Sequence, residues 1–407
     1  MVKLADKYHC TGCAACYQSC SKSAISMVCD EEGFLQPIID ENKCVECGLC
    51  SKRCPVLSPL DHKSNNNLSA YALISYEDRK VSSSGGAFSV FAKWILSQGG
   101  VVYGASSCAG LNVKHIRIDN VKDLCKLRGS KYVQSEMGSI FKNVKNDLVN
   151  GVKVLFVGTG CQVAGLYSFL NNKRYENLLF TLDLVCHGVP SYSCFRAYLE
   201  KLKNENSPKG ELGNVEAFCF RKFDSWSIVP TIKFTKTKFK MLELSQNAYM
   251  AAFFKALIFR ESCYNCQYCN TNRVGTFTIA DFWGIGRHGK PFSKNVSAGV
   301  SLVLDNDGLM PNILPELREM AYIEKRDVEE AIVEQRNLKE AMPRTKFRDT
   351  AVKDLLSNNI SLYEYCLKYG LPCKATFKWK MAKFAKDIIY GLGLYNIYKT
   401  LIYKLGK

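Results

Sequence analysis

The sequence contains no apolar run of 18 residues and no apolar segment near its start. We therefore expect neither a membrane-spanning helix nor a secretory signal. It also has no recognisable DNA-binding motif, and its basic residues are not spread over one folded face, which disfavours a nucleic-acid partner. A cytoplasmic location follows, and it agrees with the 20 cysteines, because a reducing compartment keeps thiols free.

Acidic residues are few: 38 Asp and Glu face 55 Lys and Arg, a formal net charge of +17. The excess lies mostly at one end, because residues 374–407 hold eight lysines and one aspartate. Apolar side chains recur there at helical steps. We predict a basic helical tail over residues 344–407. A basic amphipathic helix can lie on an anionic membrane, here the inner face, but it can equally pack on the core or dock a partner.

Eight cysteines near the amino terminus form two runs with the spacing C-x2-C-x2-C-x3-C. The runs are Cys10, Cys13, Cys16 and Cys20, then Cys44, Cys47, Cys50 and Cys54. In bacterial ferredoxins this spacing carries two [4Fe-4S] clusters, and the fourth cysteine of each run ligates the other cluster. We predict one cluster on Cys10, Cys13, Cys16 and Cys54, and a second on Cys44, Cys47, Cys50 and Cys20.

Two other uses of these cysteines fit less well. Structural zinc sites pair two C-x2-C knuckles across a spacer, and four cysteines within eleven residues, twice, do not follow that pattern. A disulfide framework is disfavoured because the chain shows no secretory signal. Residues 1–58 are therefore predicted to be a dicluster ferredoxin-type domain that transfers single electrons.

A third set, Cys263, Cys266 and Cys269, repeats the C-x2-C-x2-C spacing without a fourth cysteine nearby. A third [4Fe-4S] cluster would need a distant ligand, and the candidates are Cys161, Cys186, Cys194 and Cys219. We favour Cys186. A zinc knuckle, or a pair of ligands beside a spectator thiol, remains the alternative.

Between these cysteine sets the pattern is that of a mixed α/β domain. Residues 59–69 are polar and predict a linker, and residues 70–343 predict the core. Strands are expected at 71–76, 101–105, 115–118, 152–157, 178–185, 277–279 and 300–304, with a helix from about 84 to 97 and a hairpin region at 214–242. The short apolar runs between helices suit a sheet that is buried on both faces.

Three segments of the core carry candidate chemistry. Ser83, Ser84, Gly85 and Gly86 precede a helix, where free N–H groups favour an anion, although an ordinary serine N-cap is the simpler reading. Thr159, Gly160, Cys161 and Gln162 follow a strand, and a helix start there would lower the pKa of Cys161. Cys186 and His187 should point to opposite sides of an extended chain, one towards a metal and the other towards a ligand. Asp183 and Asp281 can be satisfied core carboxylates.

Taken together, the motifs Ser83–Gly86, Gly129–Ser135, Gly158–Gln162, Val185–Pro190 and Cys263 to Gly284 resemble the coenzyme F420 hydrogenase/dehydrogenase beta-subunit family. The ferredoxin-type head resembles its bacterial branch. The resemblance covers residues 1 to about 340, with Gly160 standing where the family typically has proline.

The resemblance implies a bound FAD and an oxidoreductase function. The flavin contacts that it implies are Ser83, Ser84, Gly85, Gly86, Ser130, Lys131, Tyr132, Gln134, Ser135, Thr159 and Gln162. Cys161 and His187 are the catalytic candidates. Partners would be ferredoxin or a redox subunit, and a hydride acceptor such as the deazaflavin coenzyme or an organic substrate, with surface-polysaccharide synthesis among the family's settings. A non-catalytic electron-transfer subunit is the alternative.

Overall fold

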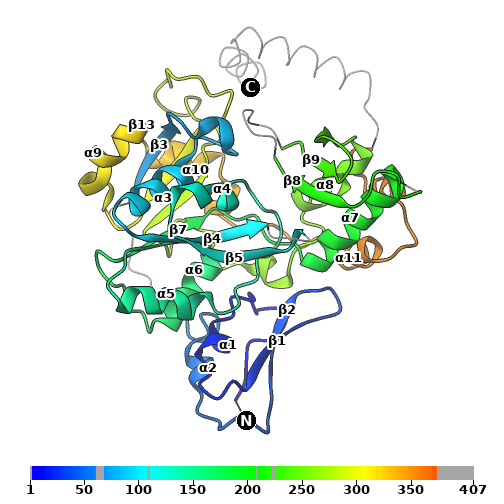
Figure 1. The fold of residues 1–407 in the computed structure, drawn as a ribbon, viewed down its shortest axis with the longest axis horizontal. Coiled ribbons are helices and arrows are strands. Elements are labelled where there is room, and N and C mark those ends of the chain that lie inside the picture. Colours follow the sequence, from blue (N-terminus) through cyan, green and yellow to red (C-terminus); the bar gives the residue numbers. More distant parts are fainter. Residues whose placement is uncertain are drawn as a thin grey trace.

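The computed structural model describes residues 2–60, 68–107, 111–207, 209–221, 226 and 228–373 (Figure 1). Its central element is an eight-stranded sheet in the order β13-β3-β12-β11-β7-β6-β4-β5. The strands are β3 (Ser69–Ser75), β4 (Val101–Ser107), β5 (Val113–Ile118), β6 (Val154–Thr159), β7 (Leu179–Leu184), β11 (Phe277–Asp281), β12 (Ser301–Asp305) and β13 (Ala321–Arg326).

Strands β4, β6, β7 and β11 are parallel, and β3 runs in the same direction because two antiparallel pairings through β12 separate it from β11. Their carboxyl ends therefore meet at one edge of the sheet. The strands predicted from short apolar runs are confirmed, as is the mixed α/β class. Strand β13 has no such run, since buried and exposed residues alternate along it.

Helices cover both faces of the sheet, as expected for buried strands. Helices α3 (Ala87–Ser97), α4 (Leu124–Leu127) and α9 (Met310–Met320) pack on one face. Helices α5 (Ile140–Val149) and α6 (Gly160–Phe169) pack on the other, below the sheet in Figure 1. The predicted helix start near Ser84 is confirmed two residues later, where Gly86 adopts φ 93° before α3.

A second lobe lies beyond the carboxyl edge of the sheet (Figure 1). It combines the antiparallel sheet β8 (Val215–Cys219), β9 (Thr231–Phe234) and β10 (Lys240–Met241), which confirms the expected hairpin region, with helices α7 (Tyr192–Asn206) and α8 (Ala248–Phe254). Helices α11 (Arg348–Leu356) and α12 (Leu362–Lys368) belong to the same apolar core. The described part of the expected tail is therefore packed into this lobe. Residues 374–407, which carry the amphipathic pattern, lie outside the described residues.

The amino-terminal head comprises α1 (Ala15–Ser19), α2 (Leu49–Lys52) and an antiparallel hairpin of β1 (Ile25–Cys29) and β2 (Leu35–Ile39). It lies against helices α5 and α6, on the opposite side from α3 (Figure 1). Helix α1 and the two residues before it contribute Cys13, Ala14 and Ala15 to the apolar layer beneath the sheet. Among the described residues, no helix is long and apolar enough to cross a membrane.

Arg260 fastens the head to the core. Its side chain is 1% exposed, and its guanidinium donates to the carbonyl oxygens of Cys10 and Leu35 and to the amide oxygens of Gln36 and Gln134 at 2.6–3.1 Å. Three of these four acceptors belong to the head. One side chain therefore satisfies groups from separate segments, as buried polar atoms require.

Replacing Arg260 with leucine should lower the free energy of unfolding by about 3 kcal/mol, because buried acceptors lose their donor. The measurement is anaerobic urea unfolding. Arg344→Leu is the matched control: this arginine is 38% exposed and its ion pair with Glu261 is superficial, so its loss should cost about 1 kcal/mol or less. Equal effects of the two substitutions would contradict the role given to Arg260.

Candidate electron-transfer site

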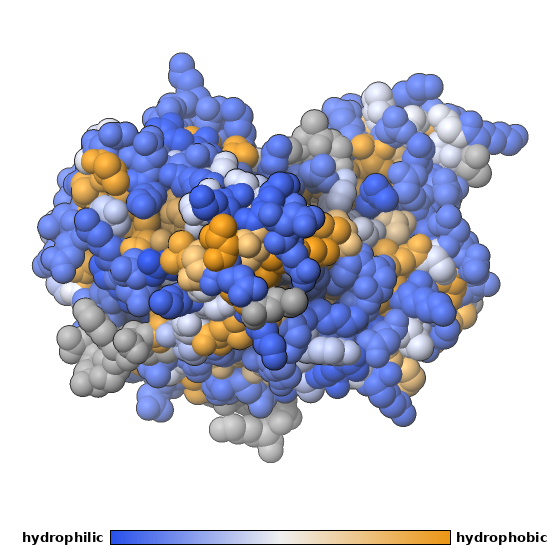
Figure 2. Space-filling model, turned by 90° about the horizontal axis from the view of Figure 1, so that it is seen from below, coloured by the Kyte–Doolittle hydropathy of each residue, from blue (hydrophilic) through white to orange (hydrophobic). Residues whose placement is uncertain are grey.

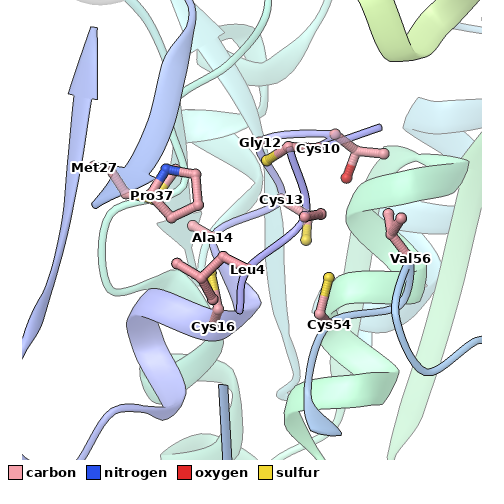
Figure 3. A pocket seen from close by; sticks show the side chains of 12 residues that line it. Leu4, Cys10, Gly12, Cys13, Ala14, Cys16, Met27, Pro37, Cys54 and Val56 are labelled. Atoms are coloured by element: carbon pink, nitrogen blue, oxygen red, sulfur yellow. The ribbon is translucent and has the colours of Figure 1, made fainter. Parts of the chain in front are cut away.

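The head folds its eight cysteines into two groups. Cys10, Cys13, Cys16 and Cys54 line one cavity of about 350 Å3, together with apolar side chains such as Leu4 and Met27. Figure 3 shows the sulfur atoms of Cys13 and Cys54 directed towards each other across it. Cys54 comes from the second run, so the grouping is the crossed one that the spacing predicts.

The second group has the same design. Cys44, Cys47 and Cys50 line a cavity of about 380 Å3 together with Cys20 from the first run. Both loops use left-handed backbone at equivalent positions, Gly12 and Ala14 in the first and Glu46 and Gly48 in the second. This shared conformation explains how two different sequences wrap around cavities in the same way.

These cavities suit clusters better than single metal ions. Among the described residues, no three His, Cys, Asp or Glu side chains lie close enough to hold one ion together. Four thiols around an apolar cavity, in contrast, are the donor set of a [4Fe-4S] cluster. Burial raises the pKa of Cys13 to about 12, with neighbouring thiols adding to the effect. Thiolates there need the positive charge of bound iron.

A third group of thiols gathers between the head and the sheet. Cys263, Cys266 and Cys269 lie beside Cys186, at the end of β7, and Cys161, at the start of α6. Burial is the largest cause of the raised pKa at Cys186 and Cys263, and a hydrogen bond with Cys269 is the largest at Cys266; charge repulsion from the neighbouring thiols raises all three further. The four candidates for a distant ligand are thus reduced to Cys161 and Cys186, since Cys194 and Cys219 pack in the second lobe.

Cys269 differs from its neighbours because polar groups stabilise its thiolate. Its pKa is lowered to about 7, first by a hydrogen bond from Cys266, then by the Asn337 amide at 3.7 Å and the charge of Arg273. Arg273 itself forms a buried ion pair with Asp183 at 2.8 Å. Asp183 is therefore a satisfied core carboxylate.

The expected lowering of the Cys161 pKa is wrong. Burial raises the pKa of this thiol and outweighs the favourable hydrogen bond with Thr159 Oγ1, whose oxygen lies 3.1 Å from the sulfur. Helix α6 does begin where predicted, with Thr159 and Gln162 forming a capping box. Cys161 thus belongs with the third group of thiols, not with exposed, activated cysteines.

Several residues that the family resemblance assigns to the flavin are held by internal hydrogen bonds. Gln162 donates to Ser135 Oγ at 2.9 Å, and the Ser135 hydroxyl lies 2.9 Å from His115 Nδ1. His115 Nε2 lies 2.9 Å from the carbonyl oxygen of Val157, so the ring is neutral with its proton on Nε2. Gln134 likewise donates to Thr11 O in the head. These three flavin candidates support the fold around the site.

Gly85 and Gly86 also serve the fold. A Cβ on Gly85 would lie 2.1 Å from the carbonyl oxygen of Leu73, and one on Gly86 would lie 2.9 Å from Ser75 Cβ. Both glycines therefore face strand β3, not an open seat for a pyrophosphate. Ser84 donates to Val300 O at 3.0 Å.

The remaining flavin candidates meet at the carboxyl edge of the sheet. Ser130 N donates to Ser83 Oγ at 3.1 Å, which joins the loop after β3 to the segment that contains Lys131 and Tyr132. The Lys131 ammonium donates hydrogen bonds to the carbonyl oxygens of Leu127 and Arg128. Ligands of open α/β sheets bind outside the carboxyl ends of the strands, so this edge is the candidate position for a cofactor.

His187 lies at the same edge. Its ring centroid is 6.2 Å from that of Phe253, and burial lowers its pKa while the charge of Asp281 raises it. Asp281 accepts 2.7 Å bonds from Arg221 and Trp226. That Cys186 and His187 point to opposite sides of the chain stays a prediction.

Two comparisons with protein families agree with this geometry. Residues 9–57 match the 4Fe-4S dicluster domain, and residues 151–331 match the C-terminal domain of the coenzyme F420 hydrogenase/dehydrogenase beta subunit. The chain therefore carries a 4Fe-4S dicluster domain and the C-terminal domain of the coenzyme F420 hydrogenase/dehydrogenase beta subunit. It is an iron–sulfur electron-transfer protein related to that beta subunit, with an oxidoreductase role.

No curated protein matches the chain. Among solved structures, a chain of the F420-reducing [NiFe] hydrogenase complex from Methanosarcina barkeri is similar at 14% identity, with a TM-score of 0.41. The match covers 73% of this chain and 92% of that chain.

Several residues that shape the site were missed by sequence reasoning. Arg221 and Arg260 stand outside any spaced motif, and each acts on groups distant along the chain. Tyr268, which packs against Gly160, carried a signal because it lies between two cysteines of the third set.

The neutral His115 makes stability depend on pH. Burial lowers its pKa from 6.5 to about 4, so between these values the unfolded chain binds a proton that the folded chain does not. Stability should therefore fall by about 3 kcal/mol as pH drops from about 6.5 to 4. Anaerobic urea midpoints across this range should show the loss in the native protein and less of it in His115→Gln. The exposed His9→Gln serves as control, and an unchanged pH slope in His115→Gln would refute the assignment.

Proposed function

We propose that this chain is an iron–sulfur flavoprotein oxidoreductase that couples single-electron transfer to two-electron chemistry. In the proposal two [4Fe-4S] clusters occupy the head, a third occupies the thiols around Cys263, and FAD lies at the carboxyl edge of the sheet. Clusters pass one electron at a time, whereas a bound flavin collects two and exchanges a hydride. The direction of flow is left open.

One observation carries the proposal: Cys161 lies beside both the head and the third set. Its charge raises the pKa of Cys13 in the first cavity and those of Cys186 and Cys263, each after a larger effect of burial. Helix α6 brings them together, because a Cβ on Gly165 would lie 3.1 Å from Cys13 Sγ. The thiols of the first cavity thus continue into the third set.

Burial gives the head clusters an order. Cys47 is exposed and Cys44 is half-buried, whereas Cys10, Cys13 and Cys16 are buried against the core. The second cavity is thus the outer one. Val45 beside it is 60% exposed, and Figure 2 shows apolar patches on the lower face of the molecule. We place the docking of a ferredoxin or a partner redox subunit there, because exposed apolar groups near a site mark interaction surfaces.

For the third cluster the proposed ligands are Cys263, Cys266, Cys269 and Cys186. The polar support of Cys269 by Asn337 and Arg273 resembles the outer shell of metal ligands, which orients them and tunes the metal. The C-x2-C-x2-C spacing of the set is that of a cluster loop, which favours a cluster over a zinc knuckle.

For FAD, the donor set that fits comprises the Ser83 and Ser130 segments, Lys131, Tyr132 and Thr159. Hydroxyls and a lysine suit a pyrophosphate, and the Tyr132 ring lies 4.7 Å from Phe253 in an aromatic wall that suits a flavin ring. His187 borders this wall as a proton carrier, and the neutral ring that burial favours can accept a proton. Arg221 forms an ion pair with Asp281 at 2.7 Å beside it.

The alternative is a non-catalytic electron-transfer subunit that only connects a partner enzyme. Two outcomes separate the proposals. Protein purified anaerobically should contain FAD that is released on denaturation, and its absorbance should bleach with a reductant. Lys131→Ala should reduce FAD content by weakening the phosphate contact, whereas Lys7→Ala, an exposed lysine of the head, should leave it unchanged. Absence of FAD from the native protein would favour the non-catalytic role.

Iron content tests the third cluster. The native chain should bind about 12 iron atoms, four for each cluster, and Cys263→Ser and Cys186→Ser should each bind about eight. Cys194→Ser is the matched control because this buried cysteine packs in the second lobe. If Cys186→Ser binds as much iron as the native chain while Cys161→Ser binds less, the fourth ligand is Cys161 instead. If Cys263→Ser binds as much iron as the native chain, the third cluster is rejected.

A further inference from the structure

The segment between Cys266 and Cys269 joins the two proposed cluster positions physically. Gln267 Nε2 donates to the carbonyl oxygen of Pro55 at 3.1 Å and to the Tyr268 hydroxyl at 2.7 Å. Pro55 follows Cys54, a cysteine of the first cavity. A short connection therefore runs from a thiol of the head, through one hydrogen bond, to the backbone of the third set.

Tyr268 fills the space beside this connection. It is 5% exposed and packs in the same apolar layer as Cys13 and helix α6, with Cys161 and Cys266 packed against that layer.

Gly160 makes room for this ring. A Cβ at position 160 would lie 2.9 Å from Tyr268 Cβ and 3.2 Å from its Cγ, too close for any other residue without a shift. The glycine at position 160 and the position of Tyr268 therefore belong to one packing arrangement.

We propose that Tyr268, seated on Gly160, is the bridge through which electrons pass between the first head cluster and the third cysteine set. The inference rests on the proposed third cluster. One electron leaves a reduced head cluster, one iron of which returns from ferrous to ferric, and enters the third cluster, where one ferric iron becomes ferrous. No proton moves, and Tyr268 is neither oxidised nor reduced. Tunnelling is faster through packed atoms than across a void, and a smaller side chain here leaves a void.

The test is rapid mixing of the anaerobic full-length protein with dithionite, followed by freeze-quenched electron paramagnetic resonance. In Tyr268→Leu, dithionite should reduce the head clusters at the native rate. The electron paramagnetic resonance signal of the third cluster should no longer appear rapidly. Tyr268→Phe keeps the ring and should keep that rate. Tyr264→Leu is the matched control: this buried tyrosine of the same segment donates to Ala256 O at 2.7 Å on the side of Phe259.

A native rate in Tyr268→Leu would overturn the bridge. Absence of a third signal and of its iron in the native protein would instead overturn the third cluster, and the bridge with it. If Tyr268→Leu loses iron, Gly160→Ala repeats the test from the helix side, because the added methyl group displaces the ring and leaves the cysteine segment unaltered. A slower third signal in that variant supports the bridge, and an unchanged one overturns it.

Discussion

The buried guanidinium of Arg260 is the interaction on which the rest of the site depends. It donates to the carbonyl oxygens of Cys10 and of Leu35 in β2, and the backbone carbonyl of Arg260 accepts from Cys263 N at 3.0 Å. One residue thus touches the first cysteine run and the third set. Because a buried arginine must have its donors satisfied, head and core cannot separate without a large penalty. The distance between the two groups of thiols is thereby fixed.

Because head and core are held together, the thiol groups follow one another in a fixed spatial order. The outer cavity of the head is near solvent, the inner one faces α6, and the third set lies between α6 and the ends of β7 and β11. Flavin candidates follow at the carboxyl edge of the same strands. A fixed row of sites suits single-electron transfer, whereas a mobile head would suit an exchanging carrier. The neutral His115 and the capping box of Thr159 and Gln162 stabilise the loops at the carboxyl edge of the sheet.

Much of this could be predicted from the sequence, because the signals were local. The repeated cysteine spacing predicted the crossed grouping, and short apolar runs predicted strands β6 and β7. For the fourth thiol of the third set the sequence left four candidates with Cys186 favoured, since the choice depends on where β7 ends relative to a loop some 80 residues later; Cys269 Sγ lies 3.9 Å from the carbonyl oxygen of Cys186. The pKa of Cys161 was predicted wrongly because the sequence reveals the helix start, which would lower the pKa, but not the burial of the thiol, which raises it. Gly85 was read as a phosphate contact because its close approach to β3 is a tertiary feature.

The central claim of the proposal is that electrons pass between the head and a bound flavin through the third cysteine set. Its most direct test is stopped-flow absorbance of the anaerobic protein, with FAD restored, after mixing with a reduced ferredoxin. The native chain should show bleaching of the head clusters followed by bleaching of the flavin. Cys263→Ser should keep the first phase and lose the second. Flavin reduction at the native rate in Cys263→Ser would contradict the account.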